Sequence, residues 1–344
     1  MQFAIKQQGF SLVELLVAMV VASIVGMAGY VIFSSSSWSY KVQEDVSEVQ
    51  QNVRVATDML AKDIRLAGFG LPDPPFSLTI GSQTFTSPIT VTNSSTGPDT
   101  ITVVGIGFEA GTLLIGAATD CNNSGTGKIC LDSVESANNF FGSSPSYVYN
   151  TDKKYISLNG TTFIELSITQ TERTSAKLTL ETPSALDINY PDGTTVYIIQ
   201  AITYTINTAL TGCSATNPCL ARQDLAGNNT VFASGIEDIQ FAYGIDESPR
   251  DGKLDDTADG TAGYAATDFL NAPTDPSSII AVKANIVGKT RNTDSRGGTF
   301  RRQCLEDRSA DTTTCGTAQA PVTDGYRRRA LTKMIKLRNP RQGA

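Results

Sequence analysis

A long apolar run near the N-terminus constrains this chain more than any other feature. Residues 12–33 are almost entirely apolar and carry a single charge, Glu14. A helix needs roughly 20 such residues to cross a membrane, so the run is long enough to span one. A carboxylate in hydrocarbon costs up to about 3 kcal/mol, which indicates that Glu14 has a cationic partner there. The simpler alternative is a membrane anchor that tolerates one polar residue near its end.

The segment after the apolar run continues as an amphipathic helix. Apolar residues recur every three or four positions, which predicts one helical stripe lying on a folded domain. No proline interrupts residues 10–71, Gly68 is a plausible C-cap, and three prolines follow it. A helix over 10–67 would extend roughly 87 Å at 1.5 Å per residue. The stripe comprises Val42, Val46, Val49, Val53, Ala56, Leu60, Ile64 and Ala67.

The pattern of the rest of the chain predicts β structure. Short runs rich in β-branched and aromatic residues are separated by Asn-, Ser- and Gly-rich turns from residue 76 onward. The predicted fold class is therefore α+β, with one long N-terminal helix packed on an enlarged antiparallel β-sheet head. Inserted loops or a second lobe would account for the head's size. The predicted strands are 89–92, 100–106, 163–168, 177–181, 195–206, 236–243, 279–287 and 329–337.

Composition excludes several classes of function. The chain of 344 residues contains no histidine, which rules out Ser-His-Asp and Cys-His nucleophiles and every His-containing metal site. Its formal net charge of −7 argues against nucleic acid as the main partner. No G-x-S-x-G motif, metal-ligand set or paired-acid motif stands out. We therefore predict no enzymatic activity, no cofactor and no metal site.

Two charged clusters leave alternatives open. Acidic residues crowd a Gly-containing segment at 246–259, where a solvated loop and a calcium site are both open, although the EF-hand order is not reproduced. A basic C-terminus begins at Arg327 and reads as an edge strand protected by charge, with a DNA-contacting patch as the alternative. The acidic residues are Asp246, Glu247, Asp251, Asp255, Asp256 and Asp259.

The six cysteines indicate an oxidising compartment. They fall as three close pairs, none of them in a CxxC motif, and polar turn residues separate the partners. Six cysteines allow 15 connectivities, and sequence does not choose among them. Local pairing is the simplest expectation, and it would join Cys121 to Cys130, Cys213 to Cys219 and Cys304 to Cys315.

The N-terminal residues resemble the class III signal of type IV pilins and type II secretion pseudopilins. Residues 9–18 read Gly-Phe-Ser-Leu-Val-Glu-Leu-Leu-Val-Ala, with a glycine, an aromatic residue, a serine and a glutamate at fixed spacing before the apolar helix. The resemblance implies that a prepilin peptidase cuts after Gly9 and methylates the new N-terminus at Phe10. It also implies that Glu14 neutralises the N-terminal amine of a neighbouring subunit during assembly.

Three further blocks resemble PilW-type minor pilins. They are the helix end at 51–68, the strand and acidic loop at 235–246, and the closing segment with Asp-Gly-Tyr-Arg-Arg-Arg at 324–329 and Leu-Arg-Asn at 337–339. The resemblance implies a leader at 1–9, a helix at 10–68 that spans the membrane over about 10–33 and is amphipathic over 41–67, and a β-rich head at 70–344.

The function that this resemblance implies is that of a minor pilin. Such a subunit initiates or primes type IV pilus assembly and is incorporated in the fibre. Its partners would be the prepilin peptidase, other minor and major pilins, and inner-membrane lipid. It would lie in the inner membrane as a single-pass protein before assembly and at the cell surface afterwards. A pseudopilin resembling the J-type subunit of type II secretion, or a surface adhesin with a pilin anchor, are the alternatives.

Overall fold

The structure is a computed structural model with one long helix and a large antiparallel β region. It describes residues 11–72, 76–94, 97–114, 121–132, 154–167, 171–173, 178–225, 227–246, 252–254, 269–294, 300–301, 321–322 and 324–338. The helix is α1 (Leu12–Arg65), and the strands form antiparallel sheets. The predicted α+β fold class is confirmed. The chain divides into two units, residues 1–48 and 49–344, and α1 runs through the division.

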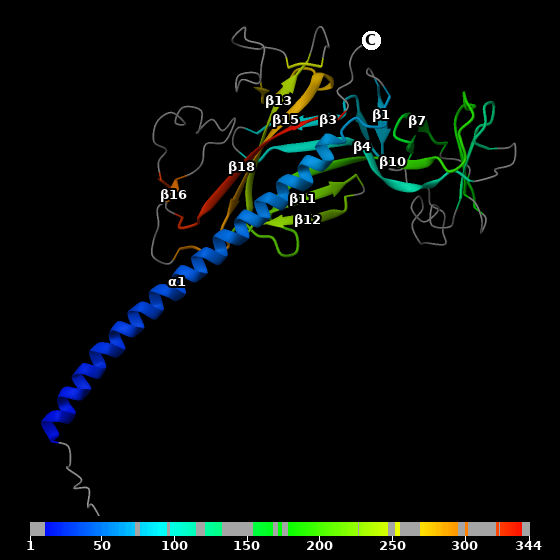
Figure 1. The fold of residues 1–344 in the computed structure, drawn as a ribbon. Coiled ribbons are helices and arrows are strands. Elements are labelled where there is room, and N and C mark those ends of the chain that lie inside the picture. The colour runs from blue at the N-terminus through cyan, green and yellow to red at the C-terminus, as the bar shows by residue number, and fades with distance from the viewer. Residues whose placement is uncertain are drawn as a thin grey trace, which may run out of the picture. The chain divides into compact units, whose positions relative to one another are not determined.

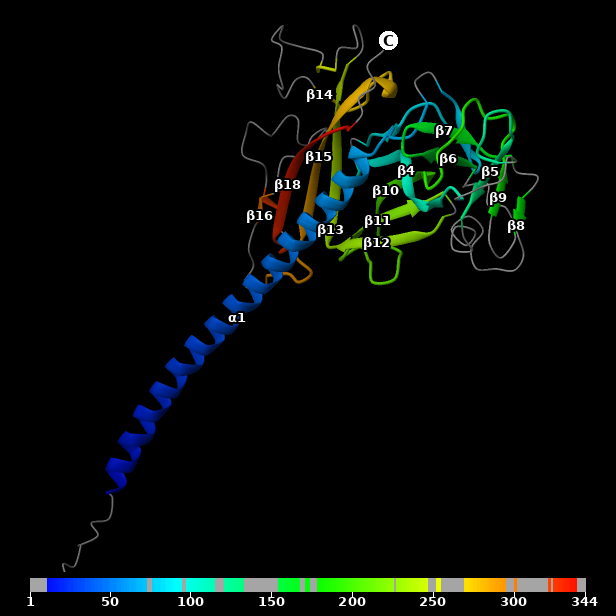
Figure 2. The same ribbon diagram turned by 45° about the vertical axis from the view of Figure 1, so that its right-hand side comes forward.

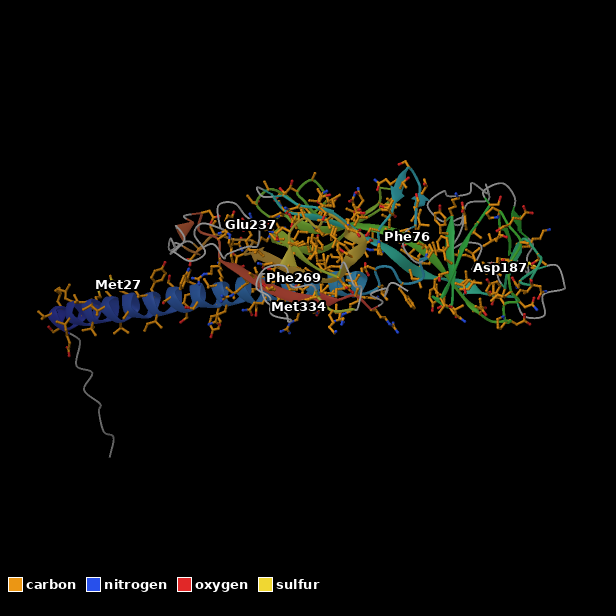
Figure 3. The ribbon with its side chains drawn as sticks, turned by 90° about the horizontal axis from the view of Figure 1, so that it is seen from above. Met27, Phe76, Asp187, Glu237, Phe269 and Met334 are labelled. Carbon is orange, nitrogen blue, oxygen red and sulfur yellow. A yellow bond between two sulfur atoms is a disulfide. The ribbon has the colours of Figure 1, made fainter. Side chains whose placement is uncertain are left out.

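Residues 12–33 of α1, which lie in the first unit, are almost entirely apolar. Their large apolar side chains are 54–76 % exposed. Figure 3 shows such side chains, Met27 among them, projecting from the helix. By length and composition alone this helix can cross a membrane, because its most apolar window has a mean hydropathy of 2.4.

The part of α1 in the second unit is built into the core of the head. Its buried residues follow the predicted stripe: Val49, Val53, Ala56, Thr57, Leu60, Ala61 and Ile64. The helix ends at Arg65, and Gly68 then adopts a φ of 76°. That left-handed conformation suits glycine at a helix C-terminus. The Gly68 N–H donates to the Val104 carbonyl at 2.9 Å, which ties the helix end to the sheet.

The larger sheet of the head has seven strands. Its main path runs in the order β12 (Asn229–Ser234), β11 (Cys219–Asp224), β10 (Thr195–Asn207), β4 (Thr100–Thr112) and β3 (Ile89–Thr92). Strand β6 (Tyr155–Leu158) pairs with β10 and with β7 (Thr162–Glu165). The long central strand β10 therefore pairs with β11 at one end and with β6 at the other, while β3 pairs with the start of β4.

A four-stranded sheet completes the main core. Its order is β14 (Phe269–Leu270), β13 (Ile236–Ile245), β15 (Ile279–Lys289) and β18 (Arg328–Lys336), and the short 3₁₀ helix η3 (Pro276–Ser278) leads into β15. Alternate residues of both sheets pack against the buried stripe of α1 in one hydrophobic cluster. Figure 1 shows the last turns of α1 lying across these strands.

Smaller sheets surround this core. A three-stranded sheet in the order β5 (Lys128–Leu131), β9 (Leu178–Glu181) and β8 (Thr171–Arg173) is visible in Figure 2, and it contributes to a second hydrophobic cluster. The hairpin of β1 (Leu78–Ile80) and β2 (Gln83–Phe85) packs on a third cluster. A further pair joins β16 (Phe300–Arg301) to β17 (Pro321–Val322).

Each of the eight predicted strands overlaps an observed one, namely β3, β4, β7, β9, β10, β13, β15 and β18. The expected enlargement of the head is present as the three-stranded sheet and its hydrophobic cluster. Among the described residues, sequence reasoning missed the strands of two to six residues at β1, β2, β5, β6, β8, β11, β12, β14, β16 and β17. Strands of two or three residues are too short for an alternating pattern, whereas the missed strands of four to six residues lie directly beside Asn-, Ser- and Gly-rich turns, which interrupt the pattern.

The helix approaches the four-stranded sheet very closely at Gly288. A Cβ added there would lie 2.5 Å from Val53 Cγ2 and 3.0 Å from Val49 Cγ1. Gly288→Ala should therefore destabilise the head by about 1–3 kcal/mol through overpacking. Val53→Ala alone should cost a similar amount by opening a cavity. The double variant should be more stable than the sum predicts, because the removed Cγ2 makes room for the new methyl group.

Equilibrium denaturation of the full chain in detergent measures the free energy of unfolding of the wild type, the two single variants and the double variant. Gly97→Ala is the matched control, since the nearest atom to its added Cβ is the end of the Ser94 side chain at 3.3 Å. Strictly additive effects of Gly288→Ala and Val53→Ala would contradict the close approach.

Candidate assembly site on the N-terminal helix

The first turn of α1 is capped by Ser11. The Ser11 carbonyl accepts the Leu15 N–H at 3.1 Å, and its side-chain oxygen accepts the Val13 N–H at 3.3 Å. Glu14 follows three residues after this cap, which is the spacing of a capping box. A carboxylate in the first turn also interacts favourably with the positive end of the helix dipole. Sequence reasoning missed this local role, although the Ser-x-x-Glu pattern was available to it.

Glu14 shares one helix face with small and β-branched residues. This face comprises Ser11, Val13, Glu14, Val17, Ala18, Val21, Ala22 and Val25. Ala18, Ala22 and Gly26 follow Glu14 at steps of four residues, so a second helix can approach this side closely. A Cβ added at Gly26 or Gly29 meets no atom within 4 Å. Nothing in the described chain therefore uses the space that these glycines leave.

The structure describes the predicted assembly residue but not the two predicted processing residues. Gly9 and Phe10 lie outside the described residues. Glu14 lies within α1, and among the residues that the structure describes none forms an ion pair with it. The structure thus places a carboxylate on an exposed apolar helix without supplying the cation that the sequence led us to expect.

Comparison with known families gives two matches. Residues 5–30 match the prokaryotic N-terminal methylation motif, and residues 196–339 match the family described as Type IV Pilus-assembly protein W. The chain is therefore similar to the PilW family over residues 196–339 and carries a pilin-type motif at its N-terminus. Both matches cover blocks that the sequence singled out, and the longer one runs from β10 through β18. No curated protein and no solved structure matches the chain.

These two matches indicate the general character of the protein. Its methylation motif implies processing by a prepilin peptidase and partnership with pilus-related pilins. The apolar helix together with this motif is consistent with membrane anchoring and association with a pilus. Similarity to a pilin family suggests a structural protein rather than an enzyme.

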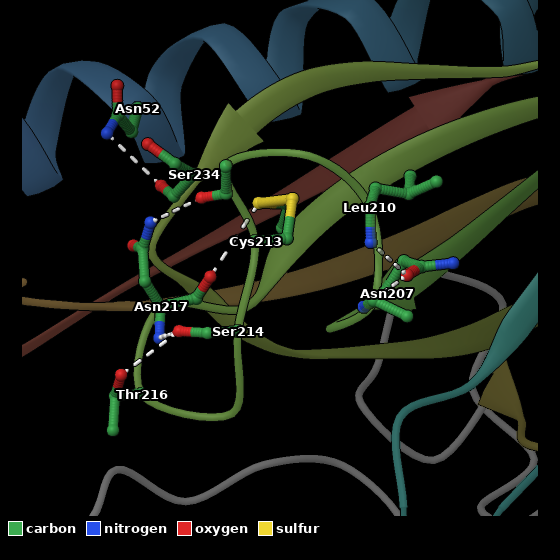
Figure 4. Close-up of a disulfide and its surroundings, with 11 residues drawn as sticks. Asn52, Asn207, Leu210, Cys213, Ser214, Thr216, Asn217 and Ser234 are labelled. Carbon is green, nitrogen blue, oxygen red and sulfur yellow. Dashed lines mark hydrogen bonds between the residues drawn. A yellow bond between two sulfur atoms is a disulfide. The ribbon is translucent and has the colours of Figure 1, made fainter.

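Two of the three expected cysteine pairs form disulfides in the head. Cys121 bonds to Cys130 with a Cα–Cα distance of 5.8 Å, and Cys213 bonds to Cys219 with 5.7 Å. Figure 4 shows the second bond closing the loop between β10 and β11, near the hydrogen bond from Asn52 of α1 to the Ser234 carbonyl. Cys304 and Cys315 lie outside the described residues, so their pairing stays a prediction.

The basic closing strand of the PilW region is held by carboxylates. The side chain of Arg328 is 3 % exposed and donates to both Glu237 and Asp324. This hydrogen bonding lowers the pKa of the Asp324 carboxyl, chiefly through Arg328. Arg327 pairs with Asp294, and Lys333 pairs with Asp58 of α1 at 2.7 Å. Strand β18 is the edge of its sheet, and these three cations fasten it to the head.

The acidic loop is only partly described. Asp246, directly after β13, accepts the Gly252 N–H at 2.7 Å. The other five acidic residues of the cluster lie outside the described residues. Within the part of the chain that the structure covers, no three potential ligands gather where they could hold a metal ion.

Proposed function

We propose that this pilin takes part in the initiation of type IV pilus assembly and is incorporated in the fibre as a minor pilin. The observation that carries the proposal is the combination of the methylation motif with an exposed apolar helix that bears one carboxylate. The match of residues 196–339 to a pilus-assembly family favours the pilus over a type II secretion system.

The proposed pathway begins in the inner membrane. Prepilin peptidase removes the leader 1–9 and methylates Phe10, while residues 10–33 cross the bilayer once and contact its lipids. The remainder of the helix to residue 68 joins the head at 70–344. After assembly the subunit leaves the bilayer and lies in the pilus at the cell surface.

Helix packing in the fibre explains the two glycines of the apolar segment. Glycine in a helix is less stable than alanine by about 1 kcal/mol, and Gly26 and Gly29 contact nothing that would offset this cost within the described chain. Close approach of another pilin helix uses the space that they leave. Minor and major pilins are therefore the partners that we assign to this face.

Glu14 supplies the electrostatic part of the docking. In an apolar bundle of pilin helices its carboxylate is stable only beside a cation. The amine of Phe10 that cleavage creates on a neighbouring subunit is such a cation. We therefore assign to Glu14 the alignment of an incoming subunit by one charge pair.

The position of cleavage tests this proposal directly. Mass spectrometry of protein purified from membranes should find the mature chain beginning at Phe10, with one methyl group on its amine. The same protein from cells that lack the prepilin peptidase should retain residues 1–9. Cleavage after Ala28, or an intact leader in cells with an active peptidase, would rule out pilin processing.

A further inference from the structure

Three aromatic residues and a lysine share one face at the C-terminal end of the apolar segment. Tyr30, Phe33 and Tyr40 are 72 %, 71 % and 72 % exposed. At 100° per residue, these three and Lys41 fall within about 100° of each other, and the middle of this arc lies about 130° from Glu14 on the helix wheel. The aromatic face and the face of Glu14 therefore point in different directions.

The chemistry of the segment 33–41 fits the boundary between hydrocarbon and water. Tyrosine combines an apolar ring with a polar tip and is enriched at membrane interfaces, and lysine extends its charged end toward the headgroups. Four serines at 34–37 end the apolar run directly after Phe33. Because helical side chains tilt toward the N-terminus, Tyr40 and Lys41 lean back toward the apolar segment.

The distance from this boundary to Glu14 matches a bilayer. Phe33 follows Glu14 by nineteen positions, which corresponds to about 29 Å along a helix. The hydrocarbon core of a bilayer is about 30 Å thick. A helix with Phe33 at one hydrocarbon boundary therefore has Glu14 at the other boundary.

We propose that residues 33–41 bind the headgroup layer of one leaflet and thereby hold Glu14 at the headgroup boundary of the opposite leaflet in the unassembled subunit. The inference rests on the membrane anchoring that we propose for this pilin. It revises the sequence-based expectation that Glu14 lies in hydrocarbon from the start. Its carboxylate meets water and lipid headgroups before assembly, and enters apolar surroundings when it packs against another subunit.

Tryptophan fluorescence tests the depth of the helix. The chain has one tryptophan, so Trp38→Phe gives a dark background into which Val13→Trp, Ile24→Trp or Tyr40→Trp is introduced. The purified monomeric subunit is placed in phosphatidylcholine–phosphatidylglycerol vesicles whose acyl chains carry bromine either near the headgroup or near the chain end. Ile24→Trp should be quenched more by the deep bromines. Val13→Trp and Tyr40→Trp should both be quenched more by the shallow ones.

Different outcomes would contradict the membrane anchoring in the proposed function and the placement of Glu14 in this inference. Failure of all three variants to float with the vesicles would overturn membrane anchoring itself. Flotation with strongest deep quenching of Val13→Trp would place the Glu14 region inside the hydrocarbon and overturn the inference alone. Flotation without quenching of Tyr40→Trp by either lipid would also overturn it, because residues 33–41 would then stand clear of the headgroups.

Discussion

A chain that carries Glu14→Val should insert into the membrane and be processed normally, yet be almost absent from pili. Valine makes the helix more apolar, so anchoring is kept or strengthened. The cleavage site at Gly9 is unchanged. What the variant loses is the charge that we assign to pairing with the Phe10 amine of a neighbouring subunit, and no other carboxylate lies in the apolar segment.

Glu14 also occupies the first turn of the helix, and this substitution removes the carboxylate from that position. Glu14 stands at the capping-box position relative to Ser11 and near the positive end of the helix dipole. Glu14→Gln is therefore the matched control, because glutamine suits the same capping position and has nearly the same length but no charge. If the charge aligns the incoming subunit, both variants should be excluded from pili.

The measurement is an immunoblot of sheared pili against the membrane fraction, with mass spectrometry to confirm processing. We expect incorporation of Glu14→Val and Glu14→Gln to fall at least about tenfold, which corresponds to about 1.4 kcal/mol of lost docking free energy. Glu14→Asp shortens the side chain by one methylene and should lose less. Wild-type incorporation of Glu14→Gln would show that capping, not charge, is the reason for this residue.

The long helix and the core strands were predictable because their patterns are long and regular. The stripe from Val49 to Ile64 repeats at helical spacing over several turns, and it is the face that packs on the sheets. The central strands β10, β13 and β15 have ten or more residues each, so their apolar content is unmistakable. Such long patterns arise because a continuous surface of the helix or strand has to be buried.

Features that depend on contacts between distant segments were not predictable. Arg328 looks from sequence like one exposed cation of a basic tail, yet it is buried between Glu237 and Asp324. Similarly, Gly288 has no local signal for the approach of Val53, which precedes it by more than 200 residues. The Ser11 cap, in contrast, was predictable from the local Ser-x-x-Glu spacing alone.

One buried carboxylate, Asp99, links the two main sheets by hydrogen bonds. Asp99 is 1 % exposed, and its carboxylate accepts the N–H groups of Ser94 and Phe241, both at 2.8 Å. Its own N–H donates to the Ile239 carbonyl at 2.9 Å. Asp99 therefore joins the segment before β4 of the larger sheet to β13 of the smaller one.

Asp99→Ala should destabilise the head by about 3–5 kcal/mol, because hydrogen bonds to a charged group contribute about 1.5–3 kcal/mol each and two N–H donors lose their acceptor. Asp99→Asn should also destabilise the head, since one carboxylate oxygen is replaced by an NH₂ group that cannot accept a hydrogen bond.

The matched control is Asp224→Ala, whose carboxylate accepts two exposed hydrogen bonds from Asn228. Because both of these hydrogen bonds are exposed and water can replace the lost acceptor, that control should cost about 1 kcal/mol or less. Urea denaturation of the full chain in detergent, followed by circular dichroism of the β signal, compares the three variants. Equal losses for Asp99→Ala and Asp224→Ala would show that the buried carboxylate does not hold the two sheets together.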